Sequence, residues 1–160
     1  MRRPTPGHGV RRRQAIVCSL AVLLLGIETG TVQQVRLTDR PITISVAVPD
    51  RIDRGATLLL RIDGVTTEPS QTATIRVFLD RPSADQSTAV SDPQFIGYFT
   101  VVPRHAGGSR KDGQNFILEI PERMVATLKR ASVQITLVPV SGSASGPGMT
   151  IKRISLEPPR

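Results

Sequence analysis

The chain has 160 residues, enough for one domain of ordinary size and an appendage, and its formal charge is +8. Its 13 glycines, 13 prolines and five aromatic residues, with no tryptophan, argue against a helical bundle and favour short strands packed through Val, Ile and Leu. Five arginines and no acidic residue lie in the first 27 residues, so the remainder is only weakly basic and has few aromatic rings to stack on bases. We therefore expect no nucleic-acid partner.

Residues 1–30 are expected to form an export signal. A basic head is followed by an apolar stretch, AIVCSLAVLLLGI at residues 15–27, and by a polar exit at Glu28. A stretch of that length makes about 20 Å of helix, which is too short for a bilayer core of about 30 Å and suits the apolar region of a secretory signal. The segment predicts either a cleaved signal peptide or an uncleaved signal anchor.

The arginines before the apolar stretch would hold the N-terminus on the cytoplasmic side of a membrane. Residues 31–160 are therefore expected to form one exported domain, which is extracytoplasmic and is either periplasmic, secreted or anchored at the inner membrane. Arg12 and Arg13 leave the general and the twin-arginine export routes both open. Contact with a membrane is expected only through the N-terminal segment.

The exported part is expected to be a sheet protein, because short segments along it alternate apolar and polar residues. In ITISVAV at residues 42–48, the isoleucines and valines fall on one face of the strand. Asp63 and Gly64 form a strong turn pair and are expected to close the third strand. The expected strands lie at residues 31–37, 42–48, 56–63, 72–79, 95–102, 116–120, 132–138 and 149–156.

Two long loops and one short helix interrupt these strands. Residues 81–93 form a thirteen-residue loop without apolar periodicity, and loops of that length are usually functional or mobile. Residues 105–115 form a second, glycine-rich loop. Pro121 opens a helix of one or two turns over residues 121–130, and Gly97 in mid-strand indicates a bulge or a close backbone approach. The fold class is therefore expected to be all-β: an antiparallel β-sandwich, jelly-roll-like, with about eight strands and one short helix, after an N-terminal signal or anchor helix.

The sequence offers no catalytic constellation. A dicopper centre needs two clusters of imidazoles, whereas the two histidines here are His8, before the apolar stretch, and His105, in the glycine loop. No strained nucleophile turn supports a triad that uses His105. Cys18, the only cysteine, lies inside the apolar stretch and is expected to be structural. We expect no enzyme activity, no catalytic residue and no cofactor.

Carboxylates around the first loop were the remaining candidates for metal binding. Asp80, Asp85 and Asp92 bracket this loop and offer oxygen ligands of the kind that Ca²⁺ prefers. Their spacing matches no calcium-binding loop, so a solvated acidic loop is the interpretation that we adopt and no metal site is expected.

Several motifs occur in a characteristic order along the exported part. They are LRIDGV at residues 60–65, RVFLDRP at 76–82, DPQFIGYF at 92–99, VQITLVPV at 133–140 and IKRISL at 151–156. This series resembles the β-sandwich domain that follows the dicopper domain in tyrosinases and plant-type polyphenol oxidases, over about residues 35–156. Gln94 stands where the family has His, and Tyr98 stands where it has a small residue.

The resemblance implies a role without catalysis. In the family this domain packs over or beside the dicopper site and can shield it, but the copper-binding domain is missing here. The implied protein is an accessory or shielding partner, in trans, of a separate dicopper phenol oxidase. The alternatives are a ligand-binding sandwich, for example for carbohydrate, a structural cell-envelope protein, and an enzyme that uses His105. The expected interaction residues lie in or beside the loops: Asp80, Arg81, Asp85, Asp92, Gln94, Phe95, Tyr98 and His105.

Overall fold

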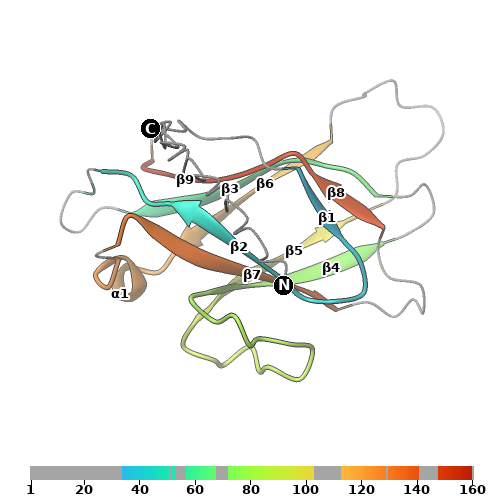
Figure 1. The fold of residues 1–160 in the computed structure, drawn as a ribbon, viewed down its shortest axis with the longest axis horizontal. Helices are drawn as coiled ribbons and strands as arrows, with labels where there is room; N and C mark the ends of the chain where they lie inside the picture. The colour runs from blue at the N-terminus through green and yellow to red at the C-terminus, as the bar shows by residue number, and fades with distance from the viewer. Residues whose placement is uncertain are drawn as a thin grey trace, which may run out of the picture.

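Short antiparallel strands make up most of the structure, a computed structural model that describes residues 34–50, 52, 57–67, 72–102, 113–128, 130–140 and 148–159. The predicted export signal and His105 lie outside the described residues. Within the described ranges, no helix has the length and apolar character needed to cross a bilayer. The elements, shown in Figure 1, are β1 (Val35–Leu37), β2 (Ile42–Ala47), β3 (Leu58–Val65), β4 (Ala73–Leu79), β5 (Phe95–Val101), β6 (Gln114–Ile120), α1 (Glu122–Val125), β7 (Ser132–Val140), β8 (Met149–Ile151) and β9 (Arg153–Glu157).

The strands form two main sheets and a small one. One sheet has the order β2-β7-β4-β5, another has the order β6-β3-β9, and β1 pairs with β8. Every pair is antiparallel. Two backbone hydrogen bonds of 2.9 Å between Thr66 and Thr150 connect β3 to β8. The prediction of an all-β antiparallel sandwich with one short helix is confirmed; the last predicted strand is divided at Lys152 into β8 and β9.

The alternation seen in the sequence places one face of each main sheet in a common core. Leu58, Leu60 and Ile62 of β3 are at most 1% exposed, and they belong to the same buried cluster as Ile75 and Val77 of β4. Burial of an aliphatic side chain of this size contributes roughly 1.5–3 kcal/mol. The sheet packing therefore rests on Val, Ile and Leu, as the composition predicts.

A second, smaller cluster, called the outer cluster below, lies on the opposite face of the four-stranded sheet. Phe78 of β4 and Val138 of β7 are fully buried there, together with Ala84 from the loop after β4 and the partly buried Phe95. The ring centroids of Phe78 and Phe95 are 5.4 Å apart. The residues between β4 and β5, called loop 81–93 below, thus fold back and cover the outside of the sheet.

The prediction that Asp63 and Gly64 close the third strand is wrong. β3 continues to Val65, with a register shift against β6 between Ile62 and Val65. Gly64 has a φ of 65°, which glycine adopts without strain, and its N–H donates to Asn115 Oδ1 over 2.8 Å. β3 pairs with β6 on one side and with β9 on the other, and this pairing keeps the chain extended past Asp63 and Gly64. The two residues therefore form a β-bulge within the strand instead of a turn at its end.

The bulge expected at Gly97 is confirmed. Val77 pairs with Gly97 while Phe78 pairs with Phe95, which leaves Ile96 as the extra residue of β5. The inserted residue brings Phe95 opposite Phe78 in the ladder, and both rings then belong to the outer cluster.

We predict that Gly64→Ala destabilises the domain by roughly 1–3 kcal/mol, because a side chain at positive φ is strained. A Cβ at this position would also lie 2.8 Å from Lys152 Cβ. Gly97→Ala is the matched control, since its φ is not positive and its Cβ would lie 3.5 Å from Leu118 Cδ2, an ordinary contact. Chemical denaturation should show a loss below about 1 kcal/mol for this control. Equal losses for the two variants would contradict the assignment of a strained bulge.

Candidate functional site

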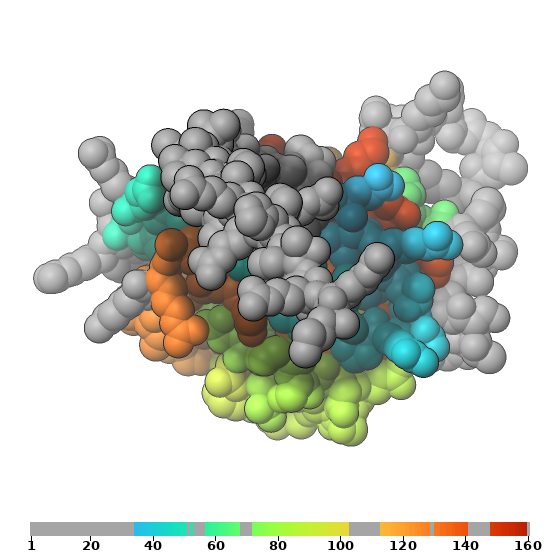
Figure 2. Space-filling model, in the orientation of Figure 1, coloured from blue at the N-terminus to red at the C-terminus, as the bar shows by residue number. Residues whose placement is uncertain are grey.

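Loop 81–93 is a series of tight, hydrogen-bonded turns and does not extend freely into solvent. Backbone hydrogen bonds of 3.0–3.1 Å run from Ala84 N–H to Arg81 O, from Thr88 N–H to Asp85 O, and from Asp92 N–H to Ala89 O. Short side chains with hydrogen-bonding groups, such as Asp and Ser, favour such turns. In Figure 2 the yellow-green residues of this loop form a band along the lower surface of the molecule. The sequence predicted a functional or mobile loop, and the structure shows one that is tied to the sheet.

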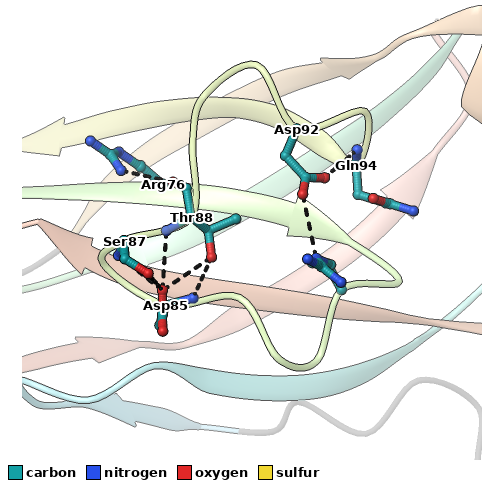
Figure 3. Close-up of polar contacts among 7 residues, drawn as sticks. Arg76, Asp85, Ser87, Thr88, Asp92 and Gln94 are labelled. Carbon is teal, nitrogen blue, oxygen red and sulfur yellow. Dashed lines mark hydrogen bonds and ion pairs between the residues drawn. The ribbon is translucent and has the colours of Figure 1, made fainter.

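Asp85 organises the first half of the loop. Its Oδ1 accepts hydrogen bonds from Ser87 Oγ at 2.6 Å, Ser87 N–H at 2.9 Å, Thr88 N–H at 3.1 Å and Thr88 Oγ1 at 3.2 Å. These bonds favour the charged carboxylate, so they hold the pKa of Asp85 below its ordinary value of 3.8, with the Ser87 hydroxyl as the largest cause. Figure 3 shows the carboxylate at the centre of this turn. The lowered pKa thus reports local hydrogen bonding in an exposed turn.

Two arginines attach the loop to the rest of the domain. Arg76 on the outer face of β4 donates from one guanidinium nitrogen to Thr88 O at 3.1 Å and to Gln86 O at 3.4 Å. Arg81 and Asp92 form an ion pair of 3.4 Å across the base of the loop. The ion pair thus fixes the base of the loop and Arg76 fixes its middle. The buried side chain of Ala84 anchors the segment between them.

An open groove of about 370 Å³ lies between the end of the loop and the turn that follows α1. Its walls come from three parts of the chain that are far apart in sequence: the end of β4, the start of β5 and the segment from α1 to β7. The lining residues are Leu79, Asp80, Pro93, Gln94, Arg123, Met124, Thr127, Leu128, Arg130 and Val133.

Asp80 fixes one end of this groove. Its φ of 49° marks a sharp change of direction after β4, of the kind that Asp tolerates better than most residues. Asp80 N–H donates to Gln134 O at 2.7 Å, and Gln134 N–H donates to Asp80 Oδ1 at 3.0 Å. This reciprocal pair holds the groove wall against β7.

The residues proposed from the sequence do not form one site. Asp80 and Gln94 line the groove, whereas Phe95 packs against the outer cluster and so helps to hold loop 81–93 on the sheet. Tyr98 is 64% exposed on β5 and is not among the residues of the groove. Arg81, Asp85 and Asp92 belong to the loop and its contacts, and His105 lies outside the described residues.

Sequence reasoning missed the half of the groove that comes from the α1 region. Arg123 and Arg130 are exposed, while Met124 is 7% exposed and closes the groove from within. The signal was present in PERMVATLKR at residues 121–130, where basic residues flank an apolar face, but only the tertiary fold places that segment beside Gln94.

The described residues supply the groove with both apolar and polar groups. No group of three or more His, Cys, Asp or Glu side chains within them could hold a metal ion. Local hydrogen bonds account for the lowered pKa of Asp85. The groove offers an apolar floor with guanidinium, amide and carboxylate groups around it.

These features define a small antiparallel β-sandwich domain with an ordered surface loop. The family model of the chloroplastic polyphenol oxidase C-terminal domain matches residues 35–157. The chain therefore belongs to this family, as the motifs of residues 60–156 predicted. No curated protein matches the chain.

Solved polyphenol oxidases share the fold. A recombinant latent aurone synthase (polyphenol oxidase) superposes with a TM-score of 0.59 at 19% identity, covering 79% of this chain and 25% of that chain. The natural-source enzyme gives 0.57 at 20% identity, with coverage of 79% and 26%. Latent apple tyrosinase gives 0.52 at 22% identity, with coverage of 79% and 28%. The chain thus corresponds in fold to about a quarter of each of these enzymes.

We predict that Ser87→Ala raises the pKa of Asp85 toward its ordinary value, because the strongest donor to the carboxylate is removed. Since the folded pKa is lowered, the carboxylate's contribution to the order of the turn is complete above 3.8 and is lost as the pH falls through the folded value. NMR titration of the Asp85 carboxyl carbon measures the shift. Ser83→Ala, in the same loop, is the control; an unchanged titration in Ser87→Ala would contradict the hydrogen-bond origin.

Proposed function

We propose that this chain is a non-catalytic, exported module that covers the dicopper site of a separate phenol oxidase. One observation carries the proposal: the family match falls on the C-terminal domain of an oxidase, while the sequence has only two histidines for a centre that needs two imidazole clusters. Such a domain contributes by contact with an oxidase rather than by chemistry of its own. Because residues 1–30 predict an export signal, the proposed place of action is extracytoplasmic.

The solved relatives support a covering role. Both the aurone synthase and the apple tyrosinase are described as latent, and this chain corresponds in fold to about a quarter of each. A part that blocks access to the metal site is one physical means of withholding an oxidase's activity, and a compact β-sandwich can block such a site through one projecting surface. We infer that this chain offers that surface to a copper centre on another polypeptide.

Loop 81–93 is the surface best suited to this contact. Val90 in its second half is 56% exposed, so its side chain is available for an apolar contact with a partner. The Arg76 contacts to Thr88 and Gln86 and the buried Ala84 hold the loop in one conformation. A surface that is already ordered loses little conformational entropy on docking, so more of the contact energy is retained in binding.

We predict that the full chain forms a complex with the dicopper domain of a phenol oxidase encoded beside it, and that the complex oxidises catechol more slowly than the free dicopper domain. Val90→Asp should weaken the complex about tenfold, because it places a charge at a desolvated contact. Size-exclusion chromatography and initial rates at increasing ratios of the two proteins measure the two effects.

Ile117→Asp is the matched control for this experiment. Ile117 is also 56% exposed, but it lies on β6, away from the loop. This variant should bind and inhibit as the wild type does. Two folded proteins that do not co-elute, with an unchanged oxidation rate, would refute the proposed function.

A further inference from the structure

We propose that the groove between the end of β4 and the α1 region binds an acidic peptide segment of a partner protein. This inference rests on the proposed function only for the identity of the partner, since the acidic segment would belong to the oxidase. The groove is a second contact surface, beside loop 81–93, and its residues come from the parts of the chain that the sequence motifs did not identify.

The groove has the size and floor of a binding site. Its volume of about 370 Å³ lies in the lower part of the range of roughly 300–1,000 Å³ that ligand sites occupy. Leu79, Met124 and Val133 are at most 7% exposed and form an apolar floor, and Leu128 is half-buried beside them. One or two aliphatic side chains of a peptide would bury their surface on this floor.

The charge around the groove selects an acidic occupant. Arg123 and Arg130 are exposed, and neither forms an ion pair with any described residue. Asp80 is the one acidic residue in the lining, and its Oδ1 already accepts the N–H of Gln134. The lining therefore carries an excess of positive charge, and each planar guanidinium can bind a carboxylate through two parallel hydrogen bonds.

The side chain of Gln94 favours a peptide over a simple anion. The main chain of Gln94 is already used, since its N–H donates to Asp92 Oδ1 at 2.9 Å and its carbonyl accepts Leu79 N–H at 2.9 Å. Its side-chain amide has no hydrogen bond to a described residue, and Figure 3 shows it directed away from Asp92. An amide offers both a donor and an acceptor, which matches a peptide backbone, whereas a simple anion offers acceptors alone.

The groove is preformed. Asp80 is held to β7 by its reciprocal hydrogen bonds with Gln134, and Thr127 Oγ1 donates to Met124 O at 2.7 Å, which fixes the turn after α1. Both walls are therefore set before a ligand arrives, and binding orders only the peptide and the two arginine side chains.

The test uses the full chain and a fluorescein-labelled peptide, acetyl-Glu-Leu-Asp-Leu-Glu-amide, followed by fluorescence anisotropy. We expect saturable binding that weakens as salt rises, and about tenfold weaker binding by the double variant Arg123→Glu, Arg130→Glu, because two ion pairs become repulsive contacts. The double variant Arg36→Glu, Arg40→Glu changes the charge equally at exposed positions outside the groove and should bind as the wild type does.

A steric variant tests the groove without changing its charge. Thr127→Trp keeps all charges, fills the groove and should also weaken binding of the peptide.

Three results of the peptide assay would each overturn the proposal. They are absence of saturable binding to the wild type, equal weakening in the two charge variants, and equal affinity for the neutral peptide acetyl-Gln-Leu-Asn-Leu-Gln-amide. Self-association of the chain that Arg123→Glu, Arg130→Glu abolishes would identify a second copy as the occupant and would overturn it as well. The two proposals fail separately: peptide binding without any oxidase complex refutes the proposed function alone, and an oxidase complex unaffected by the groove variants refutes the groove alone.

Discussion

The burial of Phe78 on the outer face of β4 is the contact on which the ordered surface of this domain depends. Alternation along β4 sends its neighbours to the core, so this ring points to the side that faces water. An exposed ring there would forgo roughly 1.5–3 kcal/mol of burial energy. Ala84, Val138 and Phe95 cover it completely. The chain after β4 must therefore turn back across the sheet instead of extending into solvent.

The rest of the surface follows from that turn. Once the loop lies on the sheet, the guanidinium of Arg76 reaches the carbonyls of Gln86 and Thr88. In the returning chain, the carbonyl of Gln94 then accepts a hydrogen bond from Leu79 N–H, which brings Gln94 to the end of β4 and so to the edge of the groove. The loop and the groove are thus two results of one packing event, although they offer different chemistry to a partner.

Strands that begin with an alternation of apolar and polar residues could be located from the sequence to within about two residues, because the pattern records which face is buried. β2 alternates along its whole length, whereas β4 and β7 alternate at first and end in runs of buried residues. The turn expected at Asp63 and Gly64 failed because tertiary pairing on both sides of β3 overrides a local preference. The sequence contains one sign of the outer cluster, which is the run of three apolar residues ending at Leu79. Only the fold shows that Ala84 packs against Phe78 in this cluster. For the same reason Asp80 and Gln94 could be proposed from their motifs, whereas Arg123 and Arg130 could not, since only the packing of α1 brings them to the same groove.

The earliest strands of the domain pair with the latest ones. Val35 of β1 lies opposite Ile151 of β8, and Ile42 of β2 lies opposite Leu137 of β7. Contacts so distant along the chain close large loops and form slowly. β1 and β2 therefore have no partners until β8 and β7 have been synthesised, and the core cannot close before then. The strands at the C-terminal side of the domain thus decide when it folds, and the apolar faces of the earlier strands stay uncovered on the ribosome until those strands emerge.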